Sequence, residues 1–141
     1  MTPASPHANV VVRTAADDVV LIRRVRKGRV YYVVPGVPVA EGETPGAAAR
    51  RAAAEVLGID VVIGTMLYAQ EHSGVDHFFF LATTSDSELR PCAALHLPDY
   101  DDFALEGTRA GSYEIVQLPR KAVLACDIRP LALARRLARK P

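Results

Sequence analysis

The alternation of apolar and polar side chains predicts three strands in the first part of the chain. Residues that are β-branched or aromatic favour strands, and they dominate three segments: residues 9–14 (NVVVRT), 19–24 (VVLIRR) and 30–34 (VYYVV). The polar stretch Ala16–Asp18 separates the first two segments, so we expect them to form a hairpin. Pro35 and Gly36 end the third strand.

The second half of the chain predicts further strands and two helices. Strand patterns occur at residues 60–68 (DVVIGTMLY), 77–82 (HFFFLA) and 112–118 (SYEIVQL), with a turn expected at residues 70–74. Residues 83–112 are rich in small and polar residues and predict a loop, which carries the acidic run that ends at Glu106. A short helix at residues 119–125 and an amphipathic, basic helix at residues 131–140 complete the chain.

The clearest helix signals surround residues 45–57. Thr44 suits the N-cap, and Pro45 suits the first helical position, where a missing N–H costs nothing. Gly58 suits the left-handed position that ends a helix. Arg51 and Glu55, four residues apart, lie on one face of this helix.

Composition indicates one ordinary globular domain of residues 9–141 behind a flexible tail of residues 1–8. Half of the residues are apolar and the net charge is +1, so nucleic-acid binding is not expected. The sequence has no segment long and apolar enough for a membrane span and no signal peptide, so we expect a cytoplasmic protein. The excess of arginine over lysine and the many alanines suggest a bacterial, GC-rich source.

The stretch from Val34 to Ile59 resembles the Nudix box, and its spacing fits that pattern without a gap. The matching positions are Glu43, Arg51, Glu55, Gly58 and Ile59; the departures are Val37, Ala52, Ala53 and Val56. The flanking segments also resemble this family. The resemblance implies an α/β (α+β) fold, the Nudix αβα sandwich, with a mixed sheet, the box helix on one side and the C-terminal helix on the other.

In the family, Glu43 and Arg51 correspond to a structural ion pair, and carboxylates at positions 52, 55 and 56 hold divalent metal ions. We expect these three side chains to project toward one side of the helix. Only Glu55 keeps its carboxylate, and Pro38 stands where a glycine is usual. Mg²⁺ binding is therefore expected to be weak, with Glu55 as the residual ligand and catalytic candidate. Glu41 is a second candidate ligand.

Candidate ligand-binding residues occur in three other parts of the sequence. Basic residues crowd around Gly28, and among them Arg23 and Arg24 form either a phosphate-facing rim or a solvated hairpin tip. Glu71 and His77 correspond to a region that lines the substrate pocket in relatives, although His77 is also consistent with simple packing. Glu106 either belongs to a solvated acidic face or replaces a lost carboxylate.

Two functions follow as hypotheses. The preferred one is a Nudix-fold protein that binds a nucleotide-like or other phosphorylated small molecule with weak or no pyrophosphohydrolase activity. The alternative is an active Mg²⁺-dependent hydrolase that cleaves a nucleoside diphosphate linked to another group, using Glu55 and a rescuing carboxylate. A homodimer is a further expectation from the family.

Overall fold

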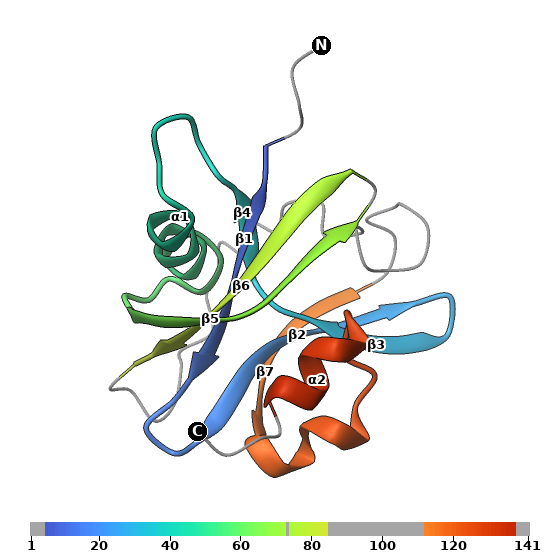
Figure 1. Ribbon diagram of the computed structural model, residues 1–141. Helices are drawn as coiled ribbons and strands as arrows, with labels where there is room; N and C mark the ends of the chain where they lie inside the picture. Colours follow the sequence, from blue (N-terminus) through green and yellow to red (C-terminus); the bar gives the residue numbers. More distant parts are fainter. Residues whose placement is uncertain (1–4, 73, 85–111, 138–141) are drawn as a thin grey trace.

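The computed structural model describes residues 5–72, 74–84 and 112–137 (Figure 1). A seven-stranded mixed sheet forms its centre, with the strand order β3-β2-β1-β6-β5; β4 pairs with β1, and β7 pairs with β2. The pairing of β1 with β6 is parallel and the other pairings are antiparallel. The strands are β1 (His7–Arg13), β2 (Asp18–Arg26), β3 (Arg29–Val33), β4 (Gly36–Pro38), β5 (Val62–His72), β6 (Val75–Thr83) and β7 (Ser112–Pro119).

Helices cover both faces of the sheet, which confirms the predicted αβα sandwich. Helix α1 (Pro45–Ala52) and the π-helix η1 (Ala53–Leu57) pack on one face, in a core that includes Val10, Val12 and Tyr31. The 3₁₀-helix η3 (Arg120–Ala125) and helix α2 (Leu131–Leu137) cover the other face, around Val11 and Phe79. Figure 1 shows α1 and α2 on opposite sides of the strands. β1 is buried along its centre because it contributes side chains to both cores.

The box helix begins and ends where the sequence predicts. Thr44 Oγ1 accepts a hydrogen bond from the Ala47 amide at 3.1 Å, and Pro45 occupies the first turn. Gly58 ends the segment in the left-handed region, with φ of 72°. The change to π-helix at Ala53 was not predicted. π-Helical turns are rare and frequently occur at functional sites.

Several predicted boundaries are wrong by a few residues. β1 already begins at His7, which pairs with Pro38 and His77 and so shortens the expected tail. The turn expected at residues 70–74 is too long, because β5 and β6 continue to pair through His72 and Val75. β4 was not predicted, since three residues that include Pro38 carry too short a pattern. Residues 85–111, which hold most of the predicted loop, and residues 138–140 lie outside the described part.

The basic hairpin between β2 and β3 turns tightly at Lys27 and Gly28, which both have positive φ. The expected hairpin of β1 and β2 is also present. Arg24, however, is fully buried, whereas both interpretations of the sequence placed it at an exposed tip or rim. The reason is its register: Arg24 lies opposite Tyr31, on the face that α1 covers, in line with Val20 and Ile22.

Candidate functional site

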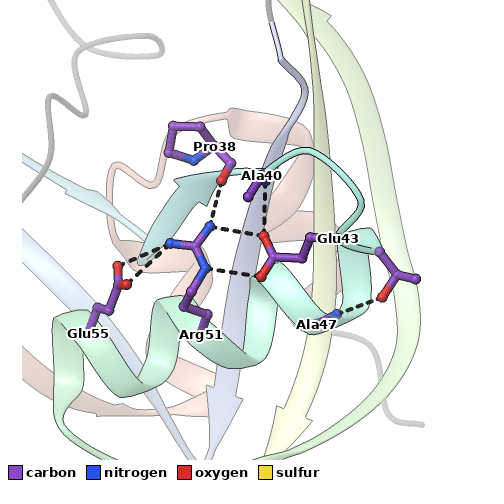
Figure 2. A network of polar contacts seen from close by, with 7 residues as sticks. Pro38, Ala40, Glu43, Ala47, Arg51 and Glu55 are labelled. Atoms are coloured by element: carbon purple, nitrogen blue, oxygen red, sulfur yellow. Dashed lines mark hydrogen bonds and ion pairs between the residues drawn. The ribbon is translucent and has the colours of Figure 1, made fainter.

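The guanidinium of Arg51 joins two parts of the Nudix-box segment (Figure 2). One is the loop of residues 39–44 between β4 and α1, called the box loop here; the other is the helix formed by α1 and η1, called the box helix. Its Nε and Nη2 donate to the two carboxylate oxygens of Glu43, each at 3.0 Å. Nη2 also donates to the carbonyl of Pro38 at 2.8 Å, and Nη1 donates to both oxygens of Glu55 at 3.2 and 3.3 Å. All three nitrogens are therefore engaged, and one cation bridges three segments of the chain.

The Glu43 carboxylate is the best-held acceptor of this network. Besides Arg51, it accepts a hydrogen bond from the Ala40 amide at 3.0 Å, and its side chain is only 18% exposed. The hydrogen bonds from Arg51 and then from Ala40 hold the pKa of Glu43 below its usual value of 4.5. The same partner, Glu43, is the main cause of the raised pKa of Arg51. Both groups therefore stay charged across the neutral range, as a two-point ion pair requires.

The three helix positions that carry carboxylates in the family do not share one environment in this chain. Glu55 is 52% exposed and contacts Arg51, whereas Ala52 and Val56 are fully buried in the core beneath the helix. The expectation that positions 52, 55 and 56 project together toward one side is therefore wrong. The π-helical segment Ala53–Leu57 widens the turn here, so the side-chain directions depart from those of a regular α-helix.

These residues do not fit a Mg²⁺ site as they are arranged. Mg²⁺ requires nearly octahedral oxygen coordination, usually with carboxylates and substrate phosphates. At the box, Arg51 already binds both the carboxylate of Glu55 and the carbonyl of Pro38. Within the described ranges, no group of three or more His, Cys, Asp and Glu side chains is placed to hold a metal ion. Glu41 is exposed in the box loop.

The other predicted contacts within the described residues lie on strands of the sheet, and none of them is a hydrogen-bond partner of Arg51. Arg23 is half-buried in β2, and its register partner on β7 is Glu114. Glu71 is exposed near the end of β5, while His77 is 2% exposed in β6. The structure therefore does not bring Glu71 or His77 to the box network, and Glu106 lies outside the described part.

Two features near these residues were missed in the sequence. His7 lies 5.0 Å from His77 between ring centroids, and His72 lies 6.4 Å from His77, so three strands bring three imidazoles to one face. The second feature is the hydrogen bond from Arg51 to the Pro38 carbonyl, because a sequence does not indicate which backbone carbonyl will accept a side-chain donor. His72 and His77 flank one turn in the sequence, but only the parallel pairing of β1 with β6 brings His7 to them, and local patterns do not predict that pairing.

Comparison with known proteins identifies the class. The sequence matches the NUDIX domain family over residues 3–117, so the chain belongs to this family. A search of curated proteins gives no match. Nudix hydrolases act on phosphorylated substrates and generally use a divalent metal such as Mg²⁺. Among the described residues, no helix is long and apolar enough to cross a membrane.

Solved structures agree on the fold. A NUDIX-family hydrolase from Clostridium perfringens shares 14% identity, with 98% of this chain and 97% of that chain covered and a TM-score of 0.65. A mutT/nudix family protein from Listeria innocua shares 19% identity, with 96% and 92% covered and a TM-score of 0.60. The MutT protein from Methanosarcina mazei shares 16% identity, with 94% and 91% covered and a TM-score of 0.58. At these identities, the likeness concerns the fold alone.

Proposed function

We propose that this protein binds a nucleotide-like or other phosphorylated small molecule and hydrolyses it weakly or not at all. The observation that carries the proposal is that Arg51 donates hydrogen bonds to both the Glu55 carboxylate and the Pro38 carbonyl. A metal ion at Glu55 therefore has to compete with the Arg51 guanidinium, a cation of the same chain that already binds this carboxylate. The buried methyl groups of Ala52 and Val56 offer no additional oxygen ligand.

Hydrolysis of a phosphoanhydride by a metal-dependent enzyme needs the metal to polarise the phosphoryl group and to activate water. Removing one preorganised electrostatic element typically costs about 10²–10³ in rate. The chain lacks two of the family's three carboxylates, so a large loss of rate is the expected direction. Binding needs less, because basic residues and backbone amides recognise phosphate without a metal.

The alternative is a Mg²⁺-dependent hydrolase of a nucleoside diphosphate linked to another group. Membership of the family supports it, and so does the 52% exposure of Glu55, which leaves its carboxylate accessible. This activity requires Glu55 to leave Arg51 and a second carboxylate to join it. Glu41 is a candidate on position in the loop, and Glu106 is a candidate on sequence alone.

A thermal-shift screen with nucleoside diphosphate compounds, each with and without Mg²⁺, tests the two functions together when the same wells are assayed for released product. A ligand at 100 times its dissociation constant stabilises by about 2.7 kcal/mol, which is readily measured. The proposal expects shifts that do not depend on Mg²⁺ and no turnover. Turnover that requires Mg²⁺ and disappears in Glu55→Gln would contradict it and establish the alternative.

A further inference from the structure

Two of the three guanidinium nitrogens of Arg51 are held by firmly placed acceptors. Glu43, whose side chain is only 18% exposed, accepts from Nε and Nη2 at 3.0 Å each. The Pro38 carbonyl, at the end of β4, also accepts from Nη2, at 2.8 Å. Because these acceptors come from the box loop and from β4, they fix the plane and the position of the guanidinium without any contribution from Glu55.

The third nitrogen, Nη1, has a weaker kind of partner. It donates to the two oxygens of Glu55 at 3.2 and 3.3 Å, and these are the longest hydrogen bonds that Arg51 makes with the described residues. The Glu55 side chain is 52% exposed, and the two residues are four apart on the helix. Exposed pairs of this kind contribute little, because water screens the charges and both side chains lose freedom. Glu55 can therefore leave Nη1 at a much smaller cost than Glu43 can leave Nε and Nη2.

Both side chains of this contact are open to solvent. The side chain of Arg51 is 34% exposed, and that of Glu55 is more exposed still, so a small anion in solution can reach Nη1 when Glu55 moves aside. Figure 2 shows Glu55 on one side of the guanidinium and Glu43 on the other. An anion that takes the place of Glu55 therefore does not disturb the pair that keeps the box loop attached.

The charges at Nη1 make Glu55 a competitor of any anion that approaches. Hydrogen bonds from Arg51 and from the Ala40 amide lower the pKa of Glu43, so this pair stays ionised and formally neutral near pH 7. Glu55 adds one further negative charge, and its oxygens occupy the donor that an incoming anion would use. When this carboxylate moves away, it exposes one edge of a preorganised guanidinium, a group that binds phosphate oxygens well.

Glu55 also belongs to the π-helical segment Ala53–Leu57, and such segments are rare and frequently occur at functional sites. We infer that the Nη1 edge of Arg51 anchors a phosphate group of the bound small molecule, and that Glu55 is an internal carboxylate that this phosphate displaces. Such an anchor deepens the proposed function, on which it depends for its ligand, by naming where the phosphate binds. Glu55 then has the opposite role from a metal ligand, because its carboxylate opposes ligand binding instead of supporting it.

The test removes the competing carboxylate and measures the affinity for pyrophosphate by calorimetry, with a chelator present to exclude divalent metals. Glu55→Ala should bind pyrophosphate about 2- to 5-fold more tightly than wild type, which corresponds to the strength of an exposed ion pair. Asp76→Ala is the matched control, because Asp76 is an exposed carboxylate on β6 and is not a hydrogen-bond partner of Arg51. It changes the net charge equally and should bind as wild type does. A gain in affinity cannot arise from misfolding.

A spectroscopic measurement locates the anion. In protein labelled with ¹⁵N and ¹³C at arginine, the Nε–H signal of Arg51 is assigned through its bonds to the backbone and followed during a titration with pyrophosphate. This signal should shift, because the anion binds to the same guanidinium. The signal of Arg50 should stay in place: Asp60 accepts from both its Nε and its Nη2, so an anion would have to break both hydrogen bonds of its fork.

Equal or weaker binding of pyrophosphate by Glu55→Ala than by wild type would overturn the inference, and so would an equal gain in Asp76→Ala or the absence of binding to both wild type and Glu55→Ala. The proposed function is judged separately, by the nucleoside diphosphate compounds. If these bind wild type without Mg²⁺ while Glu55→Ala shows no gain, the proposed function stands and the anchor at Arg51 is wrong. If Glu55→Ala alone gains affinity for pyrophosphate and no nucleoside diphosphate compound binds, the anchor stands and the proposed function is wrong.

Discussion

Arg51 Nη1 donates to both carboxylate oxygens of Glu55, at 3.2 and 3.3 Å, across one turn of the box helix. The same guanidinium holds Glu43 through its other two nitrogens. The carboxylate expected to serve a metal ion thus belongs to the ion pair that fixes the loop. Loop structure and metal affinity are therefore coupled through one side chain.

Replacement of Arg51 by Ala should lower the stability of the fold by about 1.5–3 kcal/mol, because it leaves the half-buried Glu43 without its charged partner. Thermal melting measures the effect. Arg50→Ala is the matched control, since the neighbouring Arg50 forms a similar two-point pair with Asp60 but both side chains are exposed, at 60% and 76%. The control should melt close to wild type, because an exposed ion pair is screened by solvent and contributes little to stability. Equal losses in both variants would contradict the special role of Arg51.

Restoring the family's glutamates at positions 52 and 56 should destabilise this chain. Ala52 and Val56 are fully buried, and a carboxylate forced into that core costs about 3 kcal/mol or more. Ala54→Glu, on the exposed side of the same π-helical segment, should change stability by less than about 0.5 kcal/mol. Denaturant unfolding of Ala52→Glu, Val56→Glu and Ala54→Glu tests this order. Stable variants with Mg²⁺ affinity would mean that both positions face the ligand.

Acid should weaken the contribution of the Glu43 carboxylate to the stability of the fold. The folded-state pKa of Glu43 lies below 4.5, since Arg51 and the Ala40 amide favour the ionised form. A lowered pKa gives stability that is present above pH 4.5 and is lost as the pH falls through the folded value. The difference in melting temperature between wild type and Glu43→Gln should therefore be largest near neutral pH and shrink in acid. Glu41→Gln, in the same loop but exposed, should show a smaller difference at every pH.

The sequence predicts the box helix well, because its signals are local. Thr44, Pro45 and Gly58 act on the backbone within one turn of themselves. The failures have non-local causes. The burial of Arg24 follows from its register against β3, and the length of β5 follows from its pairing with β6. Neither partner strand is identified by the segment alone.

The candidate site likewise combines features that local sequence predicts with features that depend on distant contacts. Spacing brings Arg51 and Glu55 together, and the family pattern adds Glu43. The environment of positions 52 and 56 depends instead on a π-helical segment, which the residue types in this stretch do not predict. Likewise, the hydrogen bond from Arg51 to the Pro38 carbonyl joins residues on two separate elements. Chemistry that depends on such contacts requires the structure.

The close contact of β1 with β4 gives a last prediction. A Cβ atom at Gly36 would lie 2.1 Å from Asn9 Oδ1 and 3.1 Å from the Ala8 carbonyl, so Gly36→Ala should destabilise the fold by about 1–3 kcal/mol. Asn9 is 5% exposed and donates to the Phe78 carbonyl at 3.2 Å, which leaves it little room to move. Gly46→Ala, in helix α1, is the control. Its new Cβ would lie 4.0 Å from the side chain of Ile63 on β5, an ordinary contact, and Ala is favoured over Gly in helices by up to about 1 kcal/mol. Thermal melting should therefore move in opposite directions for the two variants. A Gly36→Ala protein as stable as wild type would show that β4 does not pack against Asn9 in solution.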